Sequence, residues 1–150
     1  MQNIFELRPE ERISAWRQFR QNIQYLDRDN MLYEVAKLWA KAPIVNYYLE
    51  PDHTDQWPDP WMLISENMYC DIAISLGAFY TLFLTERFDK RDLEVVIYKD
   101  KLGFKSAVQV AEKYAININP QKPVNTSTLF KELEVYKKFT VDDLNAERYL

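Results

Sequence analysis

The sequence predicts an α+β fold with an N-terminal helical pair, a central buried helix, a small antiparallel sheet and C-terminal helices. Three observations lead to this prediction. Two amphipathic helical patterns open the chain, a strongly apolar helical pattern lies in its middle, and short runs rich in β-branched residues follow. The length of 150 residues is typical of one domain. We therefore expect a single domain over residues 1–150.

The first two elements are predicted to be a pair of amphipathic helices. Between Pro9 and Leu26 large apolar residues recur every three or four positions, and Pro9 suits the first turn. A second pattern of this kind runs from Met31 to Ala42 and stops at Pro43, which cannot continue a helix. The short polar link between the two patterns favours an antiparallel arrangement.

The stretch from Trp57 to Leu84 is predicted to contain the central buried helix. Asp59 is a favourable N-cap and Pro60 suits the first helical position, so a short helix is expected to begin there. After a polar break, apolar residues cover most of the circumference of a longer helix, which is typical of a helix buried on all sides. Cys70, the only cysteine in the sequence, lies near the start of this longer helix.

The rest of the chain is predicted to form the sheet and then the last helices. Residues 93–98 have the β-branched content of a strand, and residues 106–110 and 114–118 alternate like the two strands of a hairpin. We expect one helix over residues 126–139 and a short final helix over residues 141–149.

Composition and charge disfavour several classes of protein. The net charge of −4 disfavours nucleic-acid binding. A single cysteine allows no internal disulfide and suits a reducing compartment. The chain does not open with a signal-peptide pattern, and its longest apolar run, residues 72–84, is too short for a bilayer. We therefore expect a soluble protein that is not secreted by a signal peptide and binds neither nucleic acid nor membrane.

Motifs for phosphate, nucleotide or metal binding are absent from the sequence. His53, the only histidine, lies in a polar loop with Asp52 and Asp55. A metal site would need more ligands at a fixed spacing. The sequence therefore predicts no metal and no cofactor.

Cys70 is the candidate nucleophile. A reactive cysteine needs stabilisation of its thiolate, a general base, and a third group that orients the base. The start of the predicted helix meets the first need, but no histidine follows Cys70 in the sequence. The simpler interpretation is that Cys70 packs in the core as a small hydrophobic residue.

The stretches CDIAISLGAFYTL, SAVQV and KYAININP together resemble the transglutaminase-like fold of cysteine acyltransferases and proteases. That family has a helix that starts at Cys, a strand that begins with His-Ala, and a strand that ends in Asp-Pro. Cys70 matches the nucleophile, whereas Ser106 and Asn119 stand where the family has its histidine and aspartate. The resemblance covers residues 57–120. It implies a catalytically silent relative, because serine cannot replace imidazole as a base.

The segment WPDPW and the aromatic helix after it also resemble small uncharacterised proteins of tailed bacteriophages and their hosts. This second resemblance implies a virion or assembly role, in the host cytoplasm or in the phage particle. The predicted function is therefore a non-enzymatic structural or assembly protein of a phage head, neck or baseplate. The alternative is a cysteine-dependent hydrolase or acyltransferase that uses Cys70. The expected partners are other proteins, or further copies of this chain, and the expected contact residues are Trp57, Trp61, Tyr47 and Tyr48.

Overall fold

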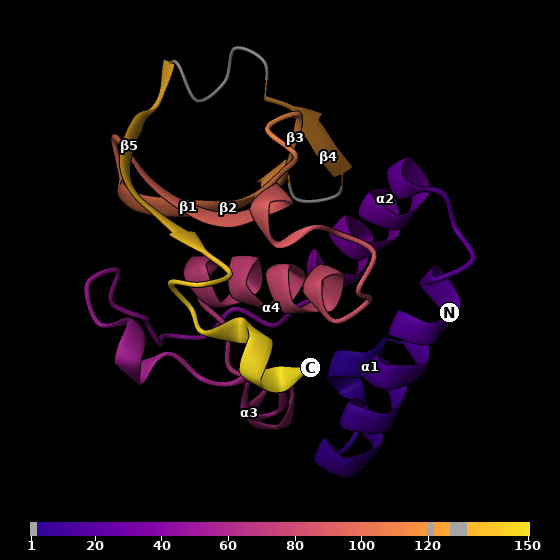
Figure 1. Cartoon of the computed structure of the whole chain (residues 1–150). Helices are drawn as coiled ribbons and strands as arrows, with labels where there is room; N and C mark the ends of the chain where they lie inside the picture. Colours follow the sequence, from indigo (N-terminus) through magenta and orange to yellow (C-terminus); the bar gives the residue numbers. More distant parts are fainter. Residues whose placement is uncertain (1–2, 120–121, 127–131) are drawn as a thin grey trace.

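Four α-helices and a five-stranded antiparallel sheet make up the described part of the computed structural model, which covers residues 3–119, 122–126 and 132–150 (Figure 1). The helices are α1 Pro9–Ile23, α2 Arg28–Trp39, α3 Pro60–Glu66 and α4 Asp71–Phe83. The strands are β1 Leu93–Asp100, β2 Gly103–Val110, β3 Tyr114–Asn119, β4 Lys122–Asn125 and β5 Glu134–Thr140. The predicted α+β fold class is confirmed.

The predicted N-terminal pair is present as α1 and α2. Pro9 is the first residue of α1, where its missing N–H removes no helical hydrogen bond. Asp27 caps α2, and its side chain accepts a hydrogen bond from the Asn30 N–H at 2.8 Å. Each helix turns one face to the core, and Trp16 and Trp39 are almost completely buried there.

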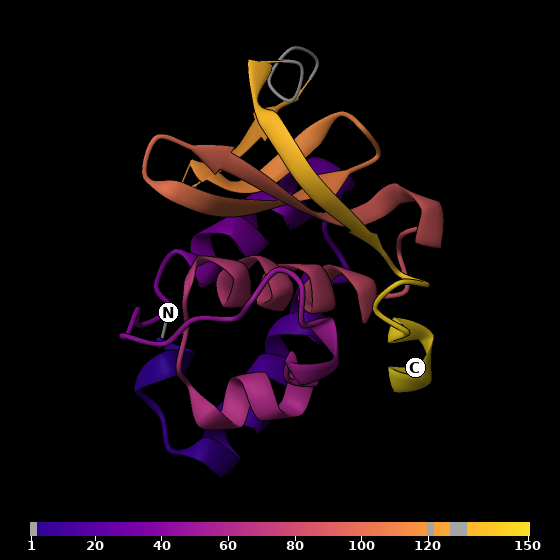
Figure 2. The same cartoon turned by 90° about the vertical axis from the view of Figure 1, so that its left-hand side faces the viewer.

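The central helix α4 packs against β1 and β2 on one side and against α3 on the other, and α2 lies beside α4 and contacts β3 and β4 (Figures 1 and 2). Every residue of Ile72–Phe83 is buried. The ring of Trp39 crosses α4 so closely that a Cβ on Gly77 would lie 2.2 Å from it. Thr81 Oγ1 accepts hydrogen bonds from the indole N–H groups of Trp16 and Trp39, at 3.0 and 2.9 Å. These contacts fix both N-terminal helices on α4.

The sheet curls over α4 in the strand order β4-β3-β2-β1-β5 (Figure 1). β1 and β2 pair from Leu93 opposite Val110 to Asp100 opposite Gly103, so residues 101 and 102 alone form the turn of this hairpin. β2 and β3 form the hairpin that the sequence predicted. The tip of the β1–β2 hairpin extends toward the start of α4, which positions the cavity described below.

The C-terminal helices of the prediction are corrected by the structure. Residues 134–139, the last part of the helix predicted over residues 126–139, belong instead to β5, which ends at Thr140. β5 pairs with the open edge of β1, whose backbone N–H and C=O groups need partners, and this pairing outweighs the local helical pattern. Residues 127–131 of that predicted helix lie outside the described residues.

The final segment is also less helical than predicted. Residues 141–145 form a turn, and the 3₁₀-helix Ala146–Tyr149 follows. Asn145 has a left-handed backbone with φ of 50°, which an α-helix does not accommodate. This residue therefore interrupts the α-helix expected over residues 141–149.

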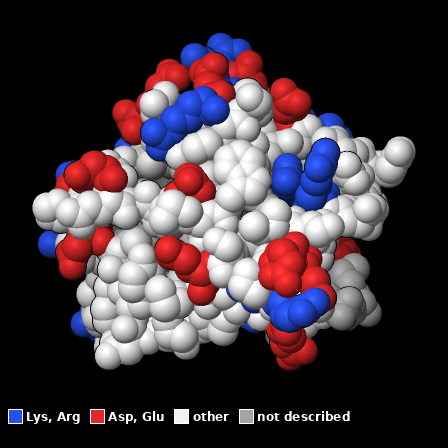
Figure 3. All heavy atoms as spheres, turned by 90° about the horizontal axis from the view of Figure 1, so that it is seen from below, with Lys and Arg blue, Asp and Glu red and all other residues white. Residues whose placement is uncertain are grey.

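Surface charge and helix length bear on the predicted partners. On the face seen from below in Figure 3, Lys and Arg side chains stand among Asp and Glu side chains and form no continuous basic surface on that face. Among the described residues, no helix combines the length and apolar character needed to cross a bilayer. The expectations about protein partners and nucleic acid stay predictions.

Candidate functional site

The start of α4 places Cys70 at a helix N-terminus and beside a backbone N–H donor. Cys70 is the N-cap residue of α4, and its C=O accepts a hydrogen bond from the Ile74 N–H at 3.0 Å. Its side chain is buried, and Sγ accepts a hydrogen bond from the Leu49 N–H at 3.4 Å. Cys70 therefore combines the N-cap position of a buried helix with a sulfur that contacts the segment before Pro51.

A cavity of about 390 Å³ opens over this end of α4. Its floor contains Cys70, Asp71 and Ile72. One wall is the segment of residues 48–51, and the other consists of Leu102, Phe104 and Lys105 at the tip of the β1–β2 hairpin. The volume lies within the range of roughly 300–1,000 Å³ that is usual for small-molecule sites. We call this feature the Cys70 cleft.

Asp71, the residue after Cys70, joins a cluster of polar side chains. Its Oδ2 accepts hydrogen bonds from the Ser106 N–H at 2.6 Å and from the Ser106 hydroxyl at 2.8 Å. Its Oδ1 accepts a hydrogen bond from the Asn117 amide at 3.3 Å. The hydroxyl oxygens of Ser106 and Ser75 are 2.7 Å apart. We call Asp71, Ser75, Ser106 and Asn117 the Asp71 cluster.

The Asp71 carboxyl is the titratable group of this cluster. Burial raises its pKa, against the hydrogen bonds from Ser106 and Asn117, which lower it. Asp71 lines the Cys70 cleft and also a second cavity, of about 350 Å³, whose lining includes Lys105 and Asn117. A carboxyl with a raised pKa that borders open space can exchange a proton with a bound molecule.

Asn117 reaches Asp71 because β3 is irregular. Its φ of 80° is left-handed inside a strand, and the pairing of β3 with β4 shifts register between Ala115 and Asn119. Asparagine tolerates this backbone better than most residues, but the conformation is still strained. The irregularity directs the Asn117 amide at Asp71 and at the Ser75 hydroxyl, the latter at 2.9 Å. Strained residues of this kind are concentrated at functional sites.

Of the two residues expected near Cys70, the structure places one in the cluster next to it. Ser106 belongs to the Asp71 cluster, which adjoins Cys70 along the chain. Asn119 ends β3, two residues beyond the asparagine that contacts Asp71. Sequence reasoning missed Asp71, Ser75 and Asn117. The spacing of four residues between Asp71 and Ser75, directly after the candidate nucleophile, was the available signal.

The expected contact residues differ in their surroundings. Tyr48 is 75% exposed and lines the Cys70 cleft, whereas Tyr47 is only partly exposed. Trp57 is partly buried, packs its ring edge-on against Phe139 and donates a hydrogen bond to the Glu50 carbonyl. Trp61 is 38% exposed and packs against Tyr149. Their roles as contact residues stay predictions.

Metal binding finds no support in the described ranges. Within residues 3–119, 122–126 and 132–150, no group of three or more His, Cys, Asp or Glu side chains could hold a metal ion. His53 is exposed and directly precedes the 3₁₀-helix Thr54–Gln56. The absence of a metal or cofactor stays a prediction.

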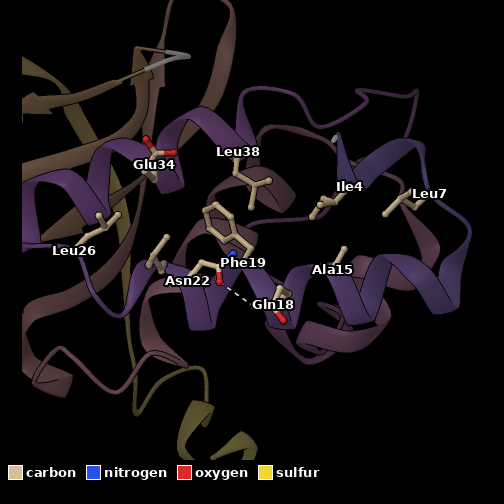
Figure 4. A pocket seen from close by; sticks show the side chains of 10 residues that line it. Ile4, Leu7, Ala15, Gln18, Phe19, Asn22, Leu26, Glu34 and Leu38 are labelled. Carbon is tan, nitrogen blue, oxygen red and sulfur yellow. Dashed lines mark hydrogen bonds between the residues drawn. The ribbon is translucent and has the colours of Figure 1, made fainter. Parts of the chain in front are cut away.

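A hollow between α1 and α2 is similar in volume to the Cys70 cleft but has different lining residues (Figure 4). It measures about 420 Å³, and Ile4, Phe19 and Leu38 supply much of its apolar lining. Its rim carries the Gln18 side-chain amide, which donates a hydrogen bond to Asn22 Oδ1 at 2.9 Å. None of its ten lining residues is a cysteine, serine, threonine or histidine. The Cys70 cleft is therefore the better candidate for chemistry.

Comparison with known proteins gives a fold relationship. No family model matches the sequence, and no curated protein does. Solved structures that match include three of LapG from Legionella pneumophila. The calcium-bound form matches with a TM-score of 0.69 and 14% sequence identity, and the EGTA-treated form with a TM-score of 0.68 and 13% identity. A third LapG structure matches with a TM-score of 0.70 and 13% identity. Each match covers 89% of this chain, and 77%, 74% and 75% of the respective LapG chains. The chain has the fold of LapG.

This relationship confirms one expectation and overturns another. LapG has the transglutaminase-like fold of a cysteine protease, so the fold implied by the first resemblance is confirmed. The resemblance to phage proteins receives no support. The prediction of a non-enzymatic virion or assembly protein was wrong, because the structures that share the fold are those of a cysteine protease. The WPDPW segment that suggested it instead forms the entry to α3, with Asp59 as N-cap and Pro60 at the first position.

Proposed function

We propose that the chain is a cysteine-dependent hydrolase or acyltransferase that uses Cys70 as its nucleophile. The observation that supports this most strongly is the place of Cys70, at the start of α4 and on the floor of a cleft, in a chain with the fold of LapG. LapG is a cysteine protease. A thiol at the start of a buried helix suits acyl-transfer chemistry.

The proposed reaction has two steps. Cys70 Sγ attacks the carbonyl carbon of an acyl or peptide substrate, an S–C bond forms, and the bond from that carbon to the leaving group breaks. The thiol proton passes to the leaving group. Water, or an acceptor amine or alcohol, then attacks the thioester, releases the acyl group and returns a proton to the sulfur.

Asp71 is the proton carrier in this proposal. No histidine follows Cys70 in the sequence, and Ser106 is not a base near neutral pH. The raised pKa of Asp71 and its position on the floor of the same cleft suit an acid–base role. Ser106 and Asn117 hold its carboxyl in place through hydrogen bonds.

Calcium has no part in the proposed reaction. LapG is described in a calcium-bound and in an EGTA-treated form. The described residues of this chain do not fit such an ion, because they contain no cluster of three acidic or other metal-ligating side chains. The proposed chemistry therefore rests on Cys70 and Asp71.

The test is acylation by p-nitrophenyl acetate, followed by release of p-nitrophenol and by mass spectrometry of the intact protein. We expect an acetyl group on Cys70, no adduct in Cys70→Ser, and acylation slowed about 100-fold in Asp71→Asn. His53→Ala is the control and should acylate within about twofold of the wild-type rate, because His53 lies on an exposed loop.

Two results would contradict the proposal. One is an acetyl group that appears on surface lysines and never on Cys70. The other is equal acylation of Cys70 in the wild type and in the unfolded chain, since the fold would then contribute nothing.

A further inference from the structure

We infer that the Cys70 cleft binds a polypeptide segment by enclosing one large apolar side chain. This inference rests on the proposed function, because the bound polypeptide would be the substrate of Cys70. The binding itself can be measured without catalysis. The residues that carry it are Tyr48 on one wall of the cleft and Leu102 and Phe104 on the other. We call these three side chains the apolar rim.

The apolar rim is unusually exposed for residues of its kind. Leu102 is 89% exposed, Tyr48 75% and Phe104 43%. The turn of the β1–β2 hairpin places Leu102 at its tip, where most of the side chain is in contact with solvent. Exposed apolar groups that cluster around a cleft indicate a binding surface, because a bound apolar group would remove them from water.

A side-chain hydrogen bond and a glycine shape the turn that carries Leu102. The Asp100 side chain accepts a hydrogen bond from the Leu102 N–H at 2.7 Å. Gly103 follows with φ of 123°, a backbone that other residues rarely adopt. The exposed leucine is therefore presented by a defined turn, which lowers the entropy that binding would cost.

Tyr136 of β5 contacts one wall of the cleft and the residue that follows the other wall. Its ring lies 4.9 Å from the ring of Phe104, centroid to centroid. Its hydroxyl reaches both carboxylate oxygens of Asp52 at 2.9 Å, next to the wall formed by residues 48–51. The Asp52 carboxylate also accepts a hydrogen bond from Lys137 Nζ at 2.6 Å. One strand thus contacts the hairpin and the loop, so the rim is formed before a ligand arrives.

The polar groups of the cleft favour a peptide over a simple hydrocarbon chain. Glu50 lies on the wall that carries Tyr48, and Lys105 lies on the wall that carries Phe104. Peptide N–H groups can donate to the glutamate, and peptide carbonyls can accept from the lysine. A fatty acyl chain offers no such groups along its length. The structure therefore favours an extended peptide whose large apolar side chain enters between the rim residues.

The experiment measures fluorescence anisotropy of labelled pentapeptides with blocked termini, identical except for a central Phe, Leu, Ser or Glu. The Cys70→Ser protein is used, so that no covalent product forms. We expect the Phe and Leu peptides to bind about tenfold or more tightly than the Ser peptide. In Leu102→Ser/Phe104→Ser, made in the same background, this preference should fall to within about twofold.

The control is Tyr25→Ser, which removes an aromatic side chain that is 93% exposed outside the cleft. It should keep the full preference for Phe and Leu. Equal binding of all four peptides, absence of binding at millimolar peptide, or a preference that survives in the rim variant would overturn the inference. Displacement of the Phe peptide by laurate alone, and not by unlabelled peptide, would overturn it in favour of an acyl chain.

The proposed function can fail separately. If the Phe preference is present and depends on the rim, but Cys70 is never acylated, the cleft binds peptides without the proposed chemistry. If Cys70 is acylated and the peptides show no preference, the chemistry stands and the inference about the rim is wrong.

Discussion

Two clusters of buried hydrogen bonds lie along α4, one around Thr81 and one around Asp71, and they differ in what they can do. The Thr81 cluster is neutral: the hydroxyl accepts from Trp16 and Trp39 and donates to the Gly77 carbonyl at 2.7 Å. The Asp71 cluster contains an ionisable group and borders two cavities. The first can only hold helices together, whereas the second can also move a proton.

A buried polar cluster is not by itself a functional site. Both clusters satisfy the groups they bury, as stability requires. Only the Asp71 cluster adds the features that chemistry needs: a titratable carboxyl whose pKa burial raises, strained backbone at Asn117, access to open space, and a thiol in the preceding residue.

Gly77→Ala should have the largest effect on stability. The added Cβ would lie 2.2 to 2.5 Å from three ring atoms of Trp39, so the ring must move and its hydrogen bond to Thr81 must lengthen. Overpacking of this severity should lower the free energy of unfolding by about 3 kcal/mol. Urea denaturation measures this change. The control Gln21→Ala, at an exposed position of α1, should remain within about 0.5 kcal/mol of the wild type.

Thr81→Val should have the second-largest effect on stability. Valine keeps the shape of threonine but accepts no hydrogen bond, so the indole N–H groups of Trp16 and Trp39 lose their shared partner. The expected loss of stability is about 2 kcal/mol, by the same denaturation experiment. Thr81→Ser retains the acceptor and should lose clearly less. Equal losses in the two variants would show that packing, and not the hydrogen bonds, makes the cluster stable.

Asp71→Asn should change how stability depends on pH. Because burial raises the pKa of Asp71 in the folded state, the folded chain keeps this proton at pH values where the unfolded chain has lost it. The wild type should therefore lose stability as the pH rises from about 4, the usual range of aspartate, through the folded pKa. The asparagine variant should lack this component of the decrease. Parallel curves for the two proteins, measured by urea denaturation from pH 4 to 8, would contradict the assignment.

Two substitutions of Asn117 should differ least in stability. Their comparison separates the contribution of backbone strain from that of the side-chain contacts. Asn117→Ala and Asn117→Gly both remove the amide that contacts Asp71 and Ser75, but only glycine adopts φ of 80° without strain. The glycine variant should therefore be more stable than the alanine variant by about 1 kcal/mol. If alanine proves equally stable, β3 is not strained at this residue.

Local sequence pattern predicted the parts of the fold that depend on local contacts. The helical periodicity after Cys70 identified α4, and the alternation after Ser106 identified the β2–β3 hairpin. β5 was predicted as a helix, because its strand conformation depends on the edge of β1, about 40 residues earlier in the chain. The single-domain organisation stays a prediction.

The candidate site was predicted only in part, for a similar reason. Cys70 could be singled out, since it is the only cysteine and precedes an apolar helix. The Asp71 cluster joins residues separated by 35 and 46 positions, and Asn117 enters it through a bulge that no periodicity signals. Ser106 and Asn119 stand where the family has its histidine and aspartate, so the sequence pattern indicated these two residues and not Asn117.

Alkylation of Cys70 by iodoacetamide at pH 7 distinguishes a thiol that reacts in the folded protein from one that only packs in the core. We expect Cys70 to be alkylated in the native protein, at a rate that stays constant in urea concentrations below the unfolding transition, and we expect the Phe pentapeptide to slow this reaction. Alkylation that occurs only as the protein unfolds, at a rate that rises in step with the unfolded fraction, would contradict the account and assign Cys70 to the core alone.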